Sequence, residues 1–342
     1  MTLIQKGETV LVTGATGFIG NVIVEEVIAA GFNVRGTSRD ANKAKFLTEH
    51  ISKKFGESRL EIVDVPDMAG DHAYDEAIKG VAGIIHIAAV LTLSANPDEV
   101  IAPCIKGTLN VFSAALNEPK VRSLVICSSS TAALVPTANT RIVVNKNTWN
   151  ESILEDVRTN PTPSPYEIYA ASKTGAERAL WEAVEEKQPS FQVAAVLPTT
   201  NFGYHIRATG NSSNDWLKDA YDGKPSMLSS LPPQYFINVR DDAKLHVIAL
   251  TDPTCNGERI LGFAEPFMLN RVLALLRKLY PGRDFGEDKD MGEDICEVAN
   301  AEAEDLLRKH YGHGFTGFEE TIKEGLAPAA SELQNDRHYI DP

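Results

Sequence analysis

The chain of 342 residues contains only four cysteines, and no two of them form a close pair such as CxxC. Their scattered spacing fits neither a zinc site nor a disulfide scaffold, and it favours a reducing compartment. We therefore expect no metal site and a cytoplasmic location. The four cysteines are Cys104, Cys127, Cys255 and Cys296.

Long hydrophobic runs are also absent. The longest apolar stretch, residues 81–91, is too short to cross a bilayer and is interrupted by His86. The N-terminus lacks the cationic segment and apolar core of a signal peptide. The sequence thus predicts a soluble protein with no membrane partner.

Positive charge is scarce, because 33 Lys and Arg residues face 47 Asp and Glu residues, a formal net charge of −14. This balance argues against a nucleic-acid partner, whose phosphates need a cationic surface. A local basic pocket for a small phosphate ligand remains compatible with it. The 43% of hydrophobic and 23% of charged residues are ordinary for a globular protein and exclude intrinsic disorder.

Short apolar runs alternate with helical patterns through the first two hundred residues. Because these runs lack polar alternation, they predict strands of a parallel sheet that helices cover on both faces. The sequence therefore predicts a Rossmann-type, doubly wound α/β fold, with the carboxyl ends of the strands along one edge. The predicted strands are 9–13, 33–37, 60–63, 83–87, 123–127 and 191–197, and the predicted helices are 18–30, 41–54, 74–79, 99–117 and 166–187.

The length predicts about two domains. After Pro198 the alternation ends, and the following residues are rich in Gly, Ser, Asn and Pro. We expect a dinucleotide-binding domain over 1–198, to which 236–263 returns. A smaller, discontinuous substrate-binding lobe is expected from 199–235 and 264–342.

The motif TGATGFIG lies directly between the first predicted strand and helix, with Gly14, Gly17 and Gly20 three residues apart. Glycine permits the tight turn, the approach of a pyrophosphate and close contact of helix and strand. The phosphates would bind free N–H groups at the start of the helix. The alternative is a strand–helix turn that binds no ligand. The position of the motif between a strand and a helix, at the start of a doubly wound pattern, favours a cofactor site. The predicted contacts are Gly14, Thr16, Gly17, Phe18 and Ile19.

The residues after the second predicted strand indicate which dinucleotide is bound. An NAD-preferring site places a carboxylate at the strand end, whereas here the run is Thr37-Ser38-Arg39-Asp40, with Lys43 one turn later. Arg39 and Lys43 can pair with a 2′-phosphate, which favours NADP(H). The alternative is a solvated basic turn, and Asp40 weakens the local positive field.

Two more strand ends are candidates for cofactor contacts. Asp64 and Val65 follow the third strand, where a carboxylate can accept a hydrogen bond from an adenine amino group. Ala88 belongs to a small-residue run after the fourth strand that would let the backbone contact a ribose. Asp64 has an alternative role as a turn residue, and we interpret His86 as a structural imidazole of the core.

Tyr169 and Lys173 lie four residues apart in a predicted helix and so share one face. An unperturbed tyrosine, with a pKa of about 10, holds its proton too tightly for proton exchange near neutrality. A nearby ammonium favours the phenolate, and Lys173 can also hold a ribose. Ser129, in a run of three serines at the end of the fifth strand, supplies a hydroxyl for a substrate oxygen. A helical pair without a role is the alternative, but the glycine turn and the serines favour catalysis.

In their order along the chain, TGATGFIG, the strand-end serines, YAASK and LPTTNFG resemble the extended short-chain dehydrogenases/reductases. Within that family the chain is similar to the dihydroflavonol-4-reductase-like branch, above all to microbial NADPH-dependent aldehyde and ketone (carbonyl) reductases. The runs RGTSRD, CSSSTAALVP, YAASKTGAERALWE and LPPQYFINVRD carry this similarity. It covers nearly the whole chain and is strongest over 9–204.

The resemblance implies stereoselective reduction of an aldehyde or ketone to an alcohol by hydride from NADPH. It makes Tyr169 the proton donor, Lys173 its partner and Ser129 the hydroxyl that orients the carbonyl. Pro198 and Thr199 would flank the nicotinamide carboxamide.

The resemblance also places Trp216 and Gln234 in the wall of the substrate pocket. The alternative for Trp216 is packing within the lobe, and the alternative for Gln234 is an amide in a loop. One departure is Cys104, which stands where many extended members have Asn, so a proton relay through that Asn is in doubt. We interpret Cys104 as a buried residue rather than a nucleophile.

Other functions stay open. One is a sugar-nucleotide epimerase or dehydratase, or a hydroxysteroid dehydrogenase, with tightly held NAD, and Arg39 and Lys43 argue against it. Another is a non-catalytic NADP-sensing protein, although such proteins usually lack the Tyr and Lys. The long helices are compatible with a homodimer. A monomer is equally compatible with the sequence.

Overall fold

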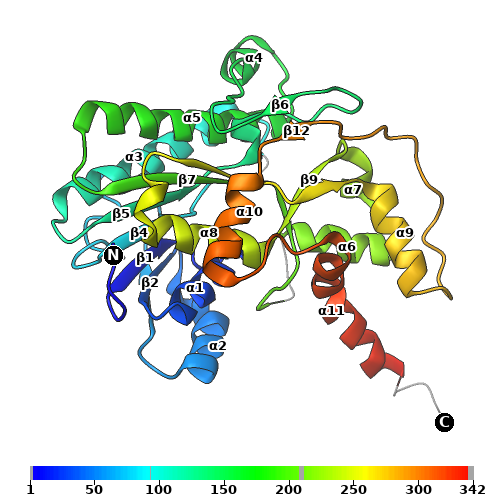
Figure 1. Cartoon of the computed structure of the whole chain (residues 1–342), viewed down its shortest axis with the longest axis horizontal. Coiled ribbons are helices and arrows are strands. Elements are labelled where there is room, and N and C mark those ends of the chain that lie inside the picture. Colours follow the sequence, from blue (N-terminus) through cyan, green and yellow to red (C-terminus); the bar gives the residue numbers. More distant parts are fainter. Residues whose placement is uncertain (1–2, 93, 208–211, 338–342) are drawn as a thin grey trace.

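The computed structural model describes residues 3–92, 94–207 and 212–337. Its centre is a sheet of seven parallel strands in the order β10-β7-β5-β4-β1-β2-β3, with helices on both faces (Figure 1). This arrangement confirms the predicted Rossmann-type fold. The strands are β1 (Thr9–Thr13), β2 (Asn33–Ser38), β3 (Leu60–Asp64), β4 (Gly83–His86), β5 (Ser123–Cys127), β7 (Gln192–Pro198) and β10 (Arg259–Gly262).

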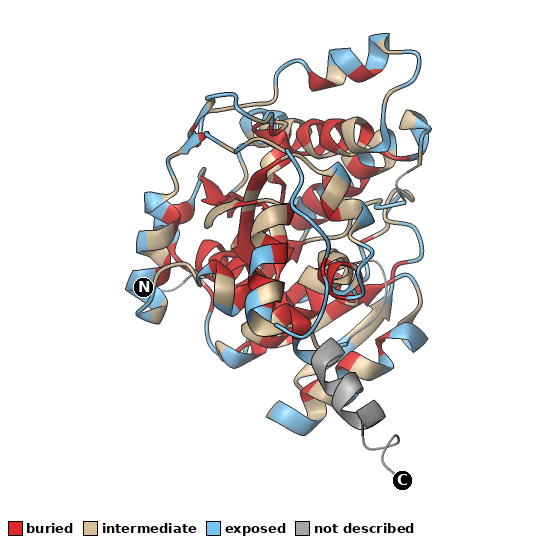
Figure 2. Cartoon of the chain, turned by 90° about the vertical axis from the view of Figure 1, so that its right-hand side faces the viewer, coloured by how far each residue is buried: buried red, intermediate tan, exposed pale blue. Residues whose placement is uncertain are grey.

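The inner strands β1, β4, β5 and β7 have no polar face because both of their faces are covered, whereas Glu61 and Asp64 of the edge strand β3 are exposed. Val10 and Val12 of β1 point into one core cluster, Leu11 points into another, and all three are fully buried. The first cluster includes helices α1 (Phe18–Ala29) and α8 (Val239–Thr251). The second cluster lies on the opposite face. It includes residues of α3 (Ile101–Asn117) and α5 (Pro165–Lys187). Buried residues accordingly concentrate in the sheet and on the inner sides of its helices (Figure 2).

Helix α5 has a well-defined start. Ser164 accepts a hydrogen bond from the Glu167 N–H, the Glu167 carboxylate accepts one from the Ser164 N–H, and Pro165 occupies the first turn. Small residues let α5 lie close to α3, since a Cβ on Gly175 would come within 3.0 Å of the Ile105 side chain. The start and the close contact together fix the helix face that carries Tyr169 and Lys173.

Three strands form a second sheet in the order β11-β9-β8, to the right of the main sheet in Figure 1. Phe202, Phe236 and Phe267 pack edge to face at its centre, with ring centroids 5.1 and 6.3 Å apart. The elements of this region are β8 (Thr200–Phe202), β9 (Gln234–Asn238), β11 (Glu265–Phe267), α6 (Ser213–Tyr221), α7 (Ser226–Ser230), α9 (Leu269–Leu279) and α11 (Phe318–Arg337).

A long segment, residues 281–300, runs from α9 back across the molecule, and we call it the strap. Its strand β12 (Glu297–Val298) pairs in parallel with β6 (Val143–Val144). The remaining elements are α2 (Lys45–Phe55), α4 (Ile153–Thr159), α10 (Ala301–Tyr311), η1 (Ala41–Ala44), η2 (Pro97–Glu99), η3 (Ser130–Ala132) and η4 (Pro253–Cys255). No helix of the described ranges is both long enough and apolar enough to span a bilayer.

Three expectations need correction. Residues 74–79 form successive turns and no helix, because His72 and Gly80 with positive φ bracket a segment too short for stable helical turns. Within the segment 236–263, β9 departs from the expected return, because it joins the second sheet through β8 and β11, whereas α8 packs on the main sheet and β10 pairs with β7. Helix α10, expected in the smaller lobe, packs on the main domain through Ala303 and Leu307. The division into two lobes otherwise stays a prediction, and its residues 208–211 and 338–342 lie outside the described ranges.

Candidate active site

The glycine turn has the geometry that its spacing predicts. Gly14 has a φ of +66°, and a Cβ on Gly20 would lie 2.1 Å from the Gly14 carbonyl oxygen. A side chain at residue 20 would therefore force the helix away from the turn. Helix α1 begins at Phe18. Gly17 occupies the N-cap position and has no side chain that could accept a hydrogen bond from the first N–H groups. The first N–H groups of α1 are thus available for an anion.

Arg39 and Lys43 lie exposed beside the carboxyl end of β2, and neither forms an ion pair with a described residue. The nearby Asp40 carboxylate accepts hydrogen bonds from the backbone and side-chain N–H groups of Asn42, both at 3.0 Å. Two exposed cations without an ion-pair partner among the described residues make this corner locally positive in a protein of net charge −14, and their contact with a 2′-phosphate stays a prediction.

Asp64 ends β3, and its carboxylate accepts a hydrogen bond of 2.6 Å from the Ala41 N–H. The Val65 N–H donates to the Ser38 carbonyl at 2.8 Å. Both contacts join β3 to the loop after β2, so a structural role of Asp64 is present in the molecule. Its contact with an adenine stays a prediction.

His86 is fully embedded at the end of β4. Its Nδ1 lies 2.9 Å from the Thr13 hydroxyl and its Nε2 lies 3.5 Å from the Thr108 hydroxyl. Burial, helped by the Lys173 ammonium, lowers the pKa of His86 to about 3 and keeps the ring neutral. The Thr13 hydroxyl also accepts the Ala88 N–H at 3.1 Å. These contacts are compatible with the structural role interpreted from the sequence, and the Thr13 hydroxyl connects His86 to Ala88, which lies next to the glycine turn.

Lys173 joins α5 to the carboxyl end of β5. Its ammonium donates a hydrogen bond of 2.8 Å to the Cys127 carbonyl, and Thr174 beside it contacts the Thr131 carbonyl at 3.4 Å. Burial alone disfavours the ammonium, but electrostatic attraction toward Tyr169, the nearby cysteines and the Glu177 carboxylate outweighs burial and raises the pKa of Lys173. The structure thus brings the helix face of Tyr169 and Lys173 against the strand end that carries the serines.

The three serines have different surroundings. Ser128 donates to the buried Glu177 carboxylate at 2.5 Å. Ser129, buried, accepts from the N–H and the hydroxyl of Thr131 at 3.2 and 3.0 Å, which leaves its own O–H to donate. Ser130 lines a cavity.

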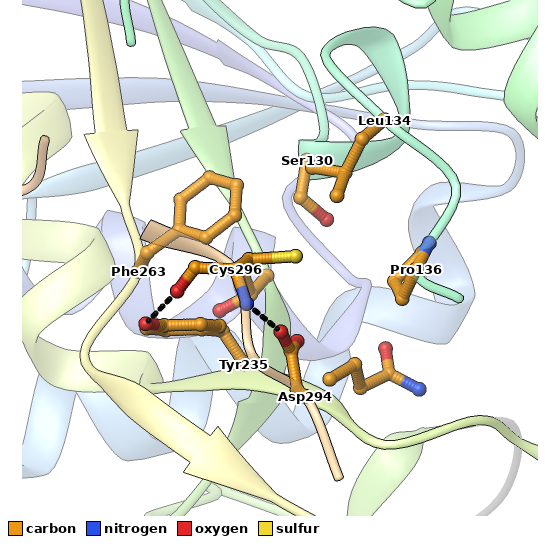
Figure 3. A pocket seen from close by; sticks show the side chains of 9 residues that line it. Ser130, Leu134, Pro136, Tyr235, Phe263, Asp294 and Cys296 are labelled. Atoms are coloured by element: carbon orange, nitrogen blue, oxygen red, sulfur yellow. Dashed lines mark hydrogen bonds between the residues drawn. The ribbon is translucent and has the colours of Figure 1, made fainter. Parts of the chain in front are cut away.

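That cavity, a narrow hollow partly open to solvent, lies where β7, β9 and η3 meet the strap. Figure 3 shows Ser130 on one side of it and Asp294 on the other. The predicted pocket residue Gln234 lines it, but its amide already contacts Thr200 and Pro232. The lining consists of Ser130, Leu134, Pro136, Thr199, Gln234, Tyr235, Phe263, Asp294 and Cys296.

Other predicted residues lie at or beside this cavity. Thr199 lines it, and the Thr199 hydroxyl donates to the Gly262 carbonyl at 3.0 Å. Pro198 is the buried last residue of β7, opposite Gly262. Trp216 is absent from the lining and packs edge-on against Phe202, with ring centroids 6.4 Å apart. For Trp216 the structure therefore supports packing within the lobe.

A second hollow lies between the strand ends of β4 and β5 and the helices α3 and α5. Lys173, Ala88 and Cys104 contribute to its wall. The Cys104 sulfur accepts the Val90 N–H at 3.3 Å and is buried, in keeping with its interpretation as a buried residue. Within the described residues, His, Cys, Asp and Glu side chains form no cluster able to hold a metal ion.

The sequence reasoning missed two features of the site. One is the buried ion pair of Glu177 and Arg259, with 2.6 Å between Oε1 and Nε, which lies behind Ser128. The other is the strap side of the cavity, formed by Asp294 and Cys296. No short-range spacing signals either one, because Glu177 and Arg259 are more than eighty positions apart and the strap residues meet other segments of the chain only at the cavity.

Comparison with known proteins gives consistent results. Residues 10–260 match the model of the NAD dependent epimerase/dehydratase family. Aldehyde reductase 2 of Sporidiobolus salmonicolor is 37% identical over 330 residues, which are 94% of this chain and 96% of the relative. Ketoreductase adrE of Penicillium rubens is 33% identical over 336 residues, 95% of this chain and 97% of the relative.

Solved structures show the same fold. The yeast methylglyoxal/isovaleraldehyde reductase Gre2, complexed with NADPH, superposes with a TM-score of 0.81 at 22% identity, covering 95% of this chain and 99% of Gre2. Vestitone reductase from alfalfa (Medicago sativa L.) superposes with a TM-score of 0.76 at 21% identity, covering 95% and 99%.

Proposed function

The chain belongs to the NAD dependent epimerase/dehydratase family, and from this premise we propose that it reduces aldehydes and ketones stereoselectively with NADPH. The observation that carries the proposal is the anchoring of Lys173 on the Cys127 carbonyl, beside the strand-end serines. It supports a site in which phenol, ammonium and serine hydroxyl act on one carbonyl group. Relatives named aldehyde reductase and ketoreductase support the same substrate class.

The residues of the chain fit NADPH in two places. The glycine turn leaves no room for a Cβ at residue 20 and offers uncapped N–H groups for the pyrophosphate. The unpaired Arg39 and Lys43 are suited to the 2′-phosphate. The structural neighbour Gre2 has NADPH bound, which supports the same cofactor here. When bound, NADPH supplies the hydride.

The protein groups then handle the charge that develops on the carbonyl oxygen. Tyr169 donates its proton to that oxygen, and the adjacent Lys173 ammonium stabilises the phenolate that remains. A serine hydroxyl donates a hydrogen bond to the same oxygen. Ser129 is the predicted donor, and its neighbour Ser130 faces the cavity.

Substitution of Tyr169 tests the proposal. Tyr169→Phe removes only the acidic proton, so we expect kcat for ketone reduction to fall by about 10²- to 10⁴-fold, with the Kd of NADPH nearly unchanged. Tyr166→Phe, one turn earlier on α5, is the matched control and should keep its activity. Absorbance loss of NADPH gives the rate and fluorescence titration gives the Kd. Full activity in Tyr169→Phe would exclude the proposed mechanism.

For the cellular location we propose the cytoplasm, and for the assembly a homodimer. All four cysteines are free and buried, which supports a reducing compartment such as the cytoplasm. A homodimer stays a prediction that light scattering of the purified chain can test.

A further inference from the structure

The cavity beside the proposed active site has an apolar middle and two polar sides. Leu134, Pro136 and Phe263 are buried apolar residues of its wall. One polar side carries Ser130 and Thr199, which directly follow the predicted site residues Ser129 and Pro198. The strap contributes the other side (Figure 3). A substrate that reached the serines through this cavity would have its other end beside the strap.

Asp294 is the charged group on the strap side. Its carboxylate accepts the Cys296 N–H at 2.8 Å, and no described cation pairs with it. Burial, with Asp294 beside it, raises the pKa of the Cys296 thiol to about 12, and the same two causes raise the pKa of the Tyr235 phenol. Both neighbours thus stay neutral. None of the nine residues of the wall is cationic, so the negative charge is uncompensated within the cavity.

The strap holds Asp294 in place from both sides along the chain. Before it, Glu293 and Asn139 exchange two hydrogen bonds, Asn139 N–H to the Glu293 carbonyl at 2.8 Å and Glu293 N–H to the Asn139 side chain at 3.0 Å. After it, β12 pairs with β6, and Arg141 forms an ion pair with Glu297. The carboxylate is therefore pre-positioned, and a ligand does not bear the cost of ordering it.

We propose that Asp294 determines specificity and that the cavity takes carbonyl compounds whose far end carries a protonated amine. This inference rests on the proposed function. An unpaired carboxylate next to buried apolar groups favours a cationic donor, because a charge-assisted hydrogen bond there replaces lost hydration. Leu134, Pro136, Phe263 and the Tyr235 ring contact the apolar body between the two ends.

Three ketones with one aromatic framework test the inference, differing only in a distal ammonium, methyl or carboxylate group. The wild type should show the highest kcat/KM for the ammonium ketone and the lowest for the carboxylate. Asp294→Asn should lower the ammonium-to-methyl ratio of kcat/KM by about tenfold or more, with the methyl ketone within about twofold of wild type. The amide keeps the shape of the side chain, so folding is preserved.

Asp290→Asn is the matched control, because Asp290 is an exposed residue of the same strap and lies outside the cavity wall. It makes the same change in net charge and should leave the ratio at the wild-type value. An unchanged ratio in Asp294→Asn, or an equal fall in Asp290→Asn, would overturn the inference.

The outcomes separate this inference from the proposed function. If the wild type reduces the methyl ketone but Asp294→Asn keeps the wild-type ratio, only the inference fails. If the wild type oxidises NADPH with none of the three ketones, the proposed function fails. Calorimetry of the ammonium and methyl ketones then decides the inference, which requires that Asp294→Asn weaken binding of the ammonium ketone alone.

Discussion

Replacement of Arg259 by Met should lower the free energy of unfolding more than the loss of an exposed ion pair does. Glu177 is fully buried and accepts hydrogen bonds from Ser128, Trp181 and Arg259. The guanidinium of Arg259 is 7% exposed and stacks on Trp149, with 3.7 Å between its Cζ and the ring centroid. It is the only cation in an ion pair with Glu177 among the described residues.

The size of the effect follows from what remains after the substitution. Met preserves the aliphatic stem but leaves the buried Glu177 carboxylate without its ion-pair partner, which typically costs about 3–5 kcal/mol. The carbonyls of Lys146 and Thr148 also lose their donor. Since domains are stable by about 5–15 kcal/mol, this is a large fraction of the total. Glu177→Gln combined with Arg259→Met should recover part of the loss, because the amide carries no charge.

Urea unfolding followed by circular dichroism measures the free energy of each variant. Arg158→Met is the control, because Arg158 pairs with Glu155 in an exposed pair on α4, where little change is expected. If Arg259→Met unfolds at the same urea concentration as Arg158→Met, the buried pair does not have the role assigned to it. The same holds if the double variant is less stable than Arg259→Met alone.

Two further outcomes follow from the structure. The double variant Arg39→Ala/Lys43→Ala should raise the KM for NADPH at least about tenfold at low salt and leave the KM for NADH near its wild-type value. An equal change in the KM of both cofactors would contradict a 2′-phosphate site. Because the pKa of His86 is lowered to about 3 from an unfolded value near 6.5, the unfolded chain takes up the proton first as the pH falls. The free energy of unfolding should therefore decrease by about 1.4 kcal/mol per pH unit below 6.5 through this group, or about 2 kcal/mol by pH 5. His86→Gln should show a correspondingly shallower slope between pH 6.5 and 5 in urea titrations, and an identical slope would contradict the assignment.

The main sheet could be predicted from the sequence because its inner strands β1, β4, β5 and β7 are short, largely apolar runs that alternate with helix patterns. Such runs form only where both faces of a parallel sheet are covered. The glycine turn and the Tyr169–Lys173 pair were also readable, because each is a local spacing within one turn or one helix. These features depend on neighbours in the sequence.

The errors come from features that depend on distant residues. Gln234–Asn238 is as buried as a central strand, but its pairing with β8 and β11 decides which sheet it joins. Trp216 packs against Phe202 and is not among the residues of the cavity wall, and its contact with a substrate stays a prediction. The wall itself combines residues from 130 to 296, and the strap residue Asp294 has no local motif that marks it.

The three consecutive serines show why identical residues in one motif cannot be assigned roles by sequence alone. In extended backbone successive side chains point to opposite sides, so Ser128 turns to the core and donates to Glu177, which Arg259 also holds. Ser129 has a φ of −161° and a ψ of 153° and caps η3 through Thr131. The chain then enters η3, and Ser130 is carried into the cavity wall. The geometry at β5 thus depends on the buried ion pair behind Ser128, because that pair fixes the strand end from which both Ser129 and Ser130 project.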